Sequence, residues 1–236
     1  MLLQHKVLAV VPARGGSKGI KLKNLREVGG VPLVAIVGRL LNGLPEIDRA
    51  VVSTDHELIR DVAVASGLEA PFLRPENLSG DRIGDLEVLT HALLAAEDDD
   101  GQHYDVVVMV QPTCPLRKKG HILDPVEKLI RGGYDAVWTV SPTDSKAHPL
   151  KQLVYRDDRL DYYDHRGASI IARQQLEPLY HRNGAAYAIS RTCLLEKKSI
   201  KGGNTSAIVI EEFLPNIDTE LDLQFADFYL NRLPKP

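Results

Sequence analysis

The sequence predicts an α/β protein built on a mostly parallel sheet with helices on both faces. The first observation is a series of short apolar runs rich in β-branched residues, which are typical of buried strands. These runs cover residues 7–11, 50–53, 106–110, 136–140, 185–189 and 207–210. The second observation is that segments with the apolar spacing of helices lie between them. These segments cover residues 32–43, 56–66, 84–97 and 119–132.

The length and composition of the chain fit a single domain spanning residues 1–236. A chain of this length, with 44% hydrophobic residues, can bury a full core. The net charge of −3 argues against a broad nucleic-acid-binding surface, so we expect no nucleic-acid partner. The N-terminal residues hold no apolar segment as long as a signal-peptide core or a membrane span, and only two cysteines occur. We therefore expect a cytoplasmic protein without membrane attachment.

The first predicted strand leads into a glycine-rich loop with several cationic side chains. The strand ends at Pro12, and Gly15, Gly16 and Gly19 follow, which lets the backbone approach a ligand closely. The cations that could neutralise phosphate charge are Arg14, Lys18, Lys21 and Lys23. The loop has neither the GK[ST] ending of a Walker loop nor the GxGxxG spacing of a dinucleotide fingerprint. It indicates a polyphosphate site of another geometry; the alternative is a surface turn with solvated lysines.

Polar motifs also follow later predicted strands. Thr54 and Asp55 come after the second strand and are possible caps for the next helix. Gln111 opens the block QPTCPLR after the third strand, where it could meet a polar ligand or simply end the strand with hydrogen bonds. In the same block we expect Cys114 to be a small packing residue, and Arg117 to be either an anchor of the site or a structural salt-bridge partner. Because ligands collect at the carboxyl ends of parallel strands, one crevice could gather these motifs.

Three other segments have a predicted structural role. Residues 141–182 contain three prolines, a tyrosine pair and several charges, so we expect an excursion from the core. Residues 97–101 form an acidic stretch that we expect to be a solvated turn. Asp218 and Thr219 fit the capping preferences at the start of a last helix near Glu220.

Eight motif blocks, taken together, resemble those of the CMP-sialic acid synthetases, the acylneuraminate cytidylyltransferases that activate nine-carbon α-keto acid sugars. The blocks are PARGGSKGIKLKNL at 12–25, VVSTD at 51–55, LRP at 73–75, QPTCPLR at 111–117, HPLK at 148–151, ARQQ at 172–175, HRNGAAY at 181–187 and IDTELD at 217–222. They stand in family order, and the resemblance covers nearly the whole chain.

The resemblance implies a fold, an activity and an assembly. The expected fold is a mostly parallel, Rossmann-like nucleotidyltransferase sheet with helices on both faces and a small arm at 141–182 that mediates dimerisation. The expected reaction transfers CMP from CTP to the anomeric hydroxyl of a nonulosonic, sialic-acid-like sugar and releases pyrophosphate. Mg²⁺ or Mn²⁺ is the expected cofactor, and the expected assembly is a homodimer with shared active sites.

For the nucleotide, the resemblance gives a set of candidate residues. Phosphate should be bound by Arg14, Ser17, Lys18 and Lys21, with Arg14 and Lys21 as the catalytic charge stabilisers. Base and ribose recognition should come from Ala13, Asn24 and Arg74. Relatives carry serine or threonine shortly after the aspartate that matches Asp81, whereas this chain has RIGD at 82–85. Asp85 could accept a hydrogen bond from the amino group of cytosine or could instead cap a helix.

For the sugar, the resemblance implies contacts from five residues. They are Gln111, Lys151, Arg173, Asn183 and Tyr187. Lys151 and Arg173 are implied to approach the substrate across the dimer interface, where cations would suit a sugar carboxylate. Taken without the resemblance, both are typical of solvated surface charges.

The expected metal site departs from the family pattern. Relatives often have two aspartates in IDIDTELD, whereas this chain has Asn216 and Asp218. Asp218 keeps one carboxylate ligand, and Asn216 offers a neutral carbonyl oxygen. One fewer negative charge should weaken metal binding or shift it toward the phosphates of the nucleotide. Asp218 is also the candidate for orienting the anomeric hydroxyl in catalysis.

Other functions remain open from the sequence. Within the same class, the enzyme could act on Kdo or use another nucleotide such as GTP. From another class, the chain could be a noncatalytic module that binds a nucleotide-sugar. A glycosyltransferase is disfavoured because its DxD-like acidic pair usually follows a central strand, and here QPTCP stands at that place.

Overall fold

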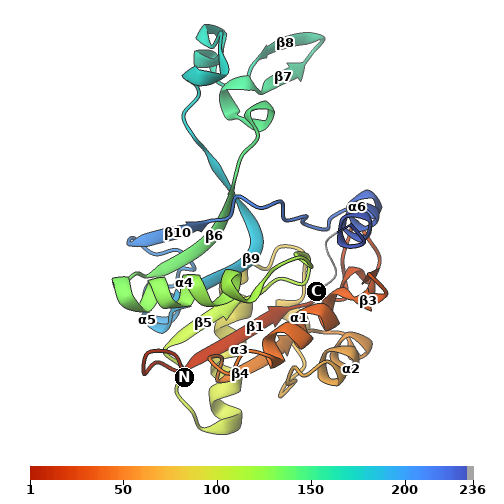
Figure 1. The fold of residues 1–236 in the computed structure, drawn as a ribbon, viewed down its shortest axis with the longest axis vertical. Coiled ribbons are helices and arrows are strands. Elements are labelled where there is room, and N and C mark those ends of the chain that lie inside the picture. The colour runs from red at the N-terminus through yellow and green to blue at the C-terminus, as the bar shows by residue number, and fades with distance from the viewer. Residues whose placement is uncertain (233–236) are drawn as a thin grey trace.

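In the computed structural model, which describes residues 1–232, six strands form one sheet between two layers of helices (Figure 1). The strand order is β10–β6–β9–β5–β1–β4, and β9 runs opposite to the other five. The strands are β1 (Val7–Pro12), β4 (Arg49–Ser53), β5 (Val106–Met109), β6 (Ala136–Pro142), β9 (Tyr180–Ser190) and β10 (Thr205–Val209). The six predicted apolar runs are therefore confirmed as the strands of a mostly parallel sheet.

The central strands are buried on both faces, as their unbroken apolar runs predict. In β1, Val7, Ala9 and Val11 pack in the core cluster that includes residues of α1 (Leu33–Asn42), α2 (Glu57–Ala65) and α4 (Lys119–Gly132). Leu8 and Val10 point the other way, to the cluster that holds residues of α3 (Asp85–Asp100) and α5 (Arg191–Leu195). Each fully buried aliphatic side chain contributes about 1.5–3 kcal/mol through the hydrophobic effect. This packing fixes where the ends of the strands lie.

The four predicted helical segments are confirmed as α1 to α4, with one correction. The acidic stretch at 97–101 is not a solvated turn, because α3 continues to Asp100 and ends at Gly101, whose φ of 67° is left-handed. Buried Arg49 pairs with both Asp99 and Asp100, at 2.5 and 2.9 Å. The carboxylates are thus held by an arginine, so their mutual repulsion does not end the helix.

The last helix, α6 (Glu220–Leu230), begins where the sequence predicts. Thr219 is its N-cap, and its side chain and that of Asp222 bond reciprocally to the backbone of this turn. Asp218 does not cap the helix through its side chain. A third core cluster joins this helix to the N-terminal half of the chain. In it, Leu223 and Ala226 pack with Val28 of the small hairpin formed by β2 (Glu27–Val28) and β3 (Val31–Pro32).

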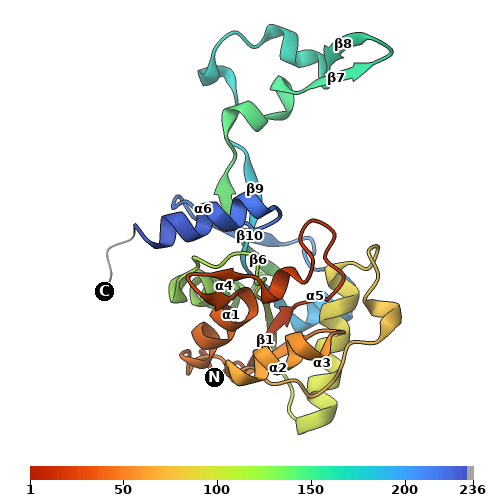
Figure 2. The same ribbon diagram turned by 90° about the vertical axis from the view of Figure 1, so that its right-hand side faces the viewer.

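The chain leaves the sheet between β6 and β9 and forms an arm. The short elements of this arm are η3 (Ser145–Ala147), η4 (Pro149–Lys151), β7 (Leu153–Arg156), β8 (Arg159–Tyr162), η5 (His165–Ser169) and η6 (Arg173–Gln175). Figure 1 and Figure 2 show residues 143–179 standing away from the sheet. Several apolar side chains of the arm are exposed, among them Tyr155, Leu160, Tyr163 and Ile171, which is 93% exposed. Across residues 1–232 as a whole, none of the helices combines the length and the apolar character that crossing a bilayer requires.

Candidate active site

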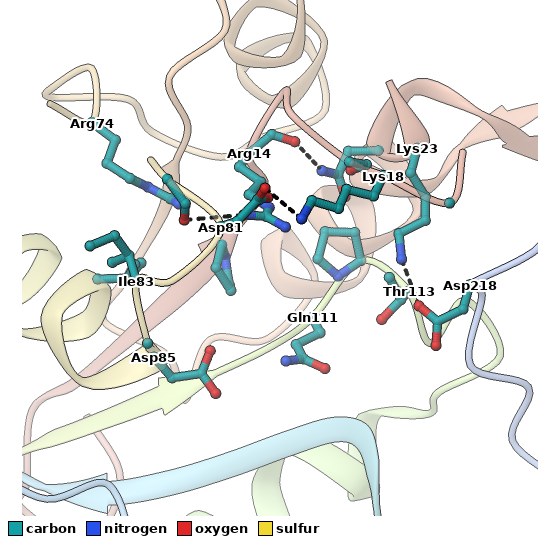
Figure 3. A pocket seen from close by; sticks show the side chains of 18 of the residues that line it. Arg14, Lys18, Lys23, Arg74, Asp81, Ile83, Asp85, Gln111, Thr113 and Asp218 are labelled. Carbon is teal, nitrogen blue, oxygen red and sulfur yellow. Dashed lines mark hydrogen bonds and ion pairs between the residues drawn. The ribbon is translucent and has the colours of Figure 1, made fainter. Parts of the chain in front are cut away.

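A cavity of about 530 Å³ opens at the carboxyl ends of β1 and β5. Its walls come from the glycine loop after β1, the loop before α3, the QPT turn after β5 and the segment before α6 (Figure 3). The predicted site residues that line it are Arg14, Ser17, Lys18, Asn24, Arg74, Asp85, Gln111, Asn216 and Asp218. The structure thus brings most of the predicted nucleotide and metal residues into the one crevice that the strand-end argument predicts.

The glycine loop is held by bonds to neighbouring segments. The amide of Ala13 donates to the carbonyl of Ser53 at 2.9 Å, which continues the pairing of β1 with β4. The amide of Gly15 donates to Oδ1 of Asp55 at 2.8 Å, and the buried Asn24 side chain donates to the carbonyl of Arg14 at 2.9 Å. Asp55 therefore anchors the loop. The N-cap of α2 is His56, so the prediction that Thr54 or Asp55 caps this helix is wrong. Ala13 is fully buried and does not line the cavity.

Two predicted phosphate-binding cations converge on one carboxylate. Nη1 of Arg14 lies 3.1 Å from Oδ1 of Asp81, and Nζ of Lys18 lies 2.7 Å from Oδ2 of the same residue. Arg14 also donates to the carbonyl of Gly80 at 3.2 Å. The hydrogen bond from Lys18, with the neighbouring charge of Arg14, lowers the pKa of Asp81. Two cations and their counter-ion therefore meet at the cavity wall (Figure 3).

Lys23, and not Lys21, lines the cavity. Its Nζ donates to Oδ1 of Asp218 at 2.9 Å and to the carbonyl of Ile217 at 2.8 Å. Lys21 is exposed, and the structure does not bring it to the other site residues. The difference arises at Leu22, which has a left-handed φ of 50° and turns the chain into η1 (Lys23–Leu25). The sequence already names Lys23 among the cations that could neutralise phosphate charge, and the structure places it in the cavity.

Arg74 combines a structural and a lining position. Its side chain is buried, and its Nε donates to Oγ of Ser53 at 2.9 Å while Nη2 donates to the carbonyl of the same residue. Burial lowers the pKa of this guanidinium. The bonds tie the loop before α3 to the end of β4, so Arg74 presents a fixed edge to the cavity.

Asp85 is the first residue of α3, but Gly84 is its N-cap. The helix-cap role predicted as one alternative for Asp85 is therefore wrong. Its carboxylate accepts a hydrogen bond from Nη2 of Arg182 at 2.9 Å and remains at the cavity wall. The guanidinium of Arg182 in turn lies over the rings of Trp138 and Tyr187, at 4.8 and 4.7 Å from their centroids.

The QPTCPLR block forms the cavity wall and its support. Gln111 lines the cavity, and Cys114 is fully buried, which confirms its packing role and raises its pKa. Arg117 is buried beneath the wall and donates to the carbonyls of Gln111 and Gly184. Among residues 1–232 it pairs with no carboxylate, so the predicted salt-bridge role is wrong. Burial lowers its pKa.

The structure does not place the other predicted sugar-binding residues in the cavity. Asn183 is buried and accepts a hydrogen bond from Oγ1 of Thr139 at 2.7 Å. The hydroxyl of Tyr187 accepts from the amide of Gly184 at 2.8 Å, so both residues support the wall from behind. Lys151 and Arg173 are exposed in η4 and η6 of the arm and do not line the cavity of their own chain.

The segment before α6 adds hard oxygen atoms to the site. Asp218, whose side chain is 70% exposed, and Asn216 both line the cavity. The glycine loop packs directly against this segment, because a Cβ added at Gly19 would lie 2.4 Å from the carbonyl oxygen of Asp218. The cavity thus combines four cationic side chains, from Arg14, Lys18, Lys23 and Arg74, with carboxylate and amide oxygens. This set suits a bound polyphosphate and a polar second substrate.

Relatives of known sequence match along nearly the full chain. A pseudaminic acid cytidylyltransferase of Campylobacter jejuni is 32% identical over 94% of both chains. A CMP-N,N'-diacetyllegionaminic acid synthase of Legionella pneumophila is 31% identical, also over 94% of both. An N-acylneuraminate cytidylyltransferase of Streptococcus agalactiae is 32% identical over 92% of this chain and 51% of its own length.

Solved structures share the fold. A CMP:2-keto-3-deoxy-manno-octonic acid synthetase, solved in complex with CTP, superposes with a TM-score of 0.71 at 16% identity, covering 96% of this chain and 99% of its own. The family model for cytidylyltransferases matches residues 8–224. The predicted family and fold class are thereby confirmed. This chain belongs to the cytidylyltransferase family, among the enzymes that resemble CMP-sialic acid synthetases.

Proposed function

We propose that this protein transfers CMP from CTP to the anomeric hydroxyl of a nonulosonic acid and releases pyrophosphate. The observation that carries the proposal is one cavity that faces Arg14, Lys18 and Lys23 toward Gln111 and Asp218. The named activities of relatives at 31–32% identity support this reaction class. In a displacement at phosphorus, positioning and charge neutralisation supply most of the catalysis, and these residues can provide both.

Each wall of the cavity has a distinct part in this reaction. Arg14 and Lys18 bind triphosphate oxygens and stabilise the leaving pyrophosphate, with Arg14 able to bind two oxygens at once. Lys23 stands beside Asp218, where it neutralises charge near the α-phosphate. Arg74 and Asp85 flank the nucleoside, and Gln111 contacts the sugar acid. The sugar hydroxyl then attacks the α-phosphorus in line with the departing pyrophosphate.

The oxygen donors before α6 fit a divalent cation shared with the nucleotide. Asp218 supplies a carboxylate and Asn216 an amide oxygen, which are hard ligands of the kind that Mg²⁺ and Mn²⁺ take. Among residues 1–232 no group of three or more acidic, histidine or cysteine side chains could hold a metal alone. Phosphate oxygens would therefore complete the coordination, and a bound Mg²⁺ would lower the repulsion between the triphosphate and the incoming hydroxyl.

We further propose a homodimer in which the arm of one chain completes the cavity of the other. The support is that Lys151 and Arg173 are exposed cations on an arm that leaves the sheet and carries exposed apolar side chains. Exposed cations of this kind would suit a sugar carboxylate and would add to those that already line the cavity. Because CTP is a cytoplasmic metabolite, the cytoplasm is the proposed location.

The identity of the sugar is tested by a substrate panel. Relatives named for pseudaminic, legionaminic and N-acylneuraminic acid match this chain at nearly equal identity, so identity does not choose among them. Pyrophosphate release would be measured with Mg²⁺ for CTP, GTP and UTP against these three acids and Kdo. The proposal predicts release with CTP and a nonulosonic acid. Release only with Kdo, or only with GTP, would overturn the acceptor or the base assignment respectively.

A further inference from the structure

Arg117 is a buried cation beneath the cavity wall that the reaction itself does not require. Its Nε and Nη1 are buried and, among residues 1–232, meet no oxygen or nitrogen acceptor; the thiol of Cys114 lies beside the guanidinium. A buried guanidinium without an ion-pair partner destabilises the folded protein, because its charge loses hydration and gains no opposite charge in exchange. Apolar side chains of similar volume often replace buried charged groups without loss of stability, so stability gives little reason for an arginine here.

The bonds that Arg117 does make join the two backbone segments behind Gln111. Its Nη2 donates to the carbonyl of Gln111, just after β5, and to the carbonyl of Gly184 in β9 at 3.3 Å. These strands are antiparallel neighbours, and the pairing of β9 with β6 is irregular at the same place, between Trp138 and Val140. Nη2 of Arg117 therefore links the end of β5 to β9 at a point where the backbone pairing of these two strands has already ended.

Gly184 in turn sets the place of the Gln111 side chain. Gly184 has a left-handed φ of 73°, and a Cβ added there would lie 2.8 Å from Oε1 of Gln111. The Gln111 amide therefore rests directly against the α-carbon of Gly184. The amide of Gly184 is held from the other side by the hydroxyl of Tyr187. A shift of Gly184 would move the surface on which Gln111 lies.

We propose that Arg117 is a positioning residue for the acceptor sugar: through the carbonyls of Gln111 and Gly184 it fixes the Gln111 amide at the cavity wall. The inference rests on the proposed function, which gives Gln111 to the sugar. It assigns Arg117 no contact with either substrate. Loss of Arg117 should therefore impair sugar use through Gln111 and leave CTP binding unchanged.

A double-mutant cycle tests this coupling. The variants are Arg117→Met, Gln111→Ala and the double variant, with the KM for the acceptor sugar and the Kd for CTP as readouts. Arg117→Met alone should raise the sugar KM about tenfold, since hydrogen bonds from a charged donor position the side chain, and leave the CTP Kd within about twofold. In the Gln111→Ala background it should add less than about twofold. Additive losses, or equal losses for CTP and sugar, would overturn the proposal.

Two further variants separate positioning from folding. Arg49→Met removes another buried arginine, which lies at the opposite end of the sheet and pairs with Glu69, Asp99 and Asp100. It should lower the melting temperature and leave the sugar KM unchanged. If Arg117→Met does not fold, Arg117→Lys keeps the charge but not the reach to both carbonyls, and it should show the same sugar-specific loss with a smaller magnitude.

A readout without activity makes the result independent of the proposed function. In NMR spectra of the side-chain amides, Arg117→Met should shift or broaden the Gln111 signal, while Arg49→Met should leave it in place. An unchanged Gln111 signal would overturn the inference whatever reaction the enzyme catalyses. A shifted signal in a protein that turns over none of the sugars would instead reject the proposed function and keep the positioning role.

Discussion

At the scale of single residues, Asp81 pairs with Arg14 and Lys18, the two cations that we propose bind the triphosphate. Its two carboxylate oxygens lie 3.1 Å from Arg14 and 2.7 Å from Lys18. In the proposed reaction, a triphosphate bound by Arg14 and Lys18 would have to displace this carboxylate, which could return when pyrophosphate leaves. We therefore expect Asp81 to compete with the phosphates and to weaken their binding.

The variant Asp81→Asn should bind pyrophosphate and CTP more tightly, by roughly three- to tenfold at low salt, because a competing charge is removed. Added salt should shrink the effect, since these side chains are partly exposed. Titration calorimetry with pyrophosphate measures both. Asp61→Asn is the matched control, since Asp61 pairs with Arg60 on α2 away from the cavity. Weaker binding by Asp81→Asn would show that the carboxylate supports the phosphates.

The two lysines of the glycine loop make a second residue-scale test. Lys23→Ala should lower kcat by about a hundredfold or more, because a positioned charge beside Asp218 is lost from the reacting end of the cavity. Lys21→Ala should change kcat by less than about threefold, since this side chain is exposed outside the cavity. Steady-state kinetics with saturating CTP compares them. The opposite ranking would restore the catalytic role that the motif assigned to Lys21.

At the scale of elements, periodicity predicts much of the fold but not the details of the site. The run 7–11 predicts β1 because both of its faces are apolar, and the pattern at 119–132 predicts α4. The C-terminal end of α3 could not be predicted from the acidic residues there, because these residues pair with Arg49, which is distant in sequence. Lys21 was preferred to Lys23 because the left-handed backbone at Leu22, which decides which lysine turns inward, has no signal in the sequence. Side-chain direction in a loop follows from such backbone details, which carry no periodic signal.

The contact between the glycine loop and the segment before α6 predicts the effect of a single methyl group. Gly19→Ala would place a Cβ 2.4 Å from the carbonyl oxygen of Asp218, so one of the two segments must move. We expect a loss of about 1–3 kcal/mol in the free energy of unfolding, together with lower kcat/KM for CTP. Gly203→Ala is the control, because a Cβ there meets nothing within 4 Å. Thermal melts and kinetics that do not differ between the two variants would contradict this packing.

At the scale of the whole molecule, the arm separates two predicted site residues from the rest. The sequence blocks HPLK and ARQQ belong to the family pattern, yet Lys151 and Arg173 lie on η4 and η6, outside the cavity of their own chain. No property of one isolated chain can predict where these cations act. If the arm of a second copy entered this cavity, Lys151 and Arg173 of that copy would lie beside the other predicted site residues.

Mixing two inactive variants tests this shared site. Asp218→Ala and Arg173→Ala should each be nearly inactive alone, because every site then lacks one group. In a dimer that contains one of each, one of the two sites has both groups intact, so the purified heterodimer should recover about half of wild-type activity. The mixture is made by co-expression with two tags, and the tagged heterodimer is purified. A heterodimer that forms but stays inactive would contradict the exchange of arms.

The central claim is that this cavity joins CMP to a nonulosonic acid. The most direct measurement is phosphorus NMR and mass spectrometry of a reaction that contains the protein, CTP, Mg²⁺ and the acceptor sugars. The account predicts a CMP-sugar and pyrophosphate in equal amounts, formed only when a nonulosonic acid is present. Release of CMP or pyrophosphate without a sugar conjugate, or intact CTP with a folded protein that binds it, would contradict the account.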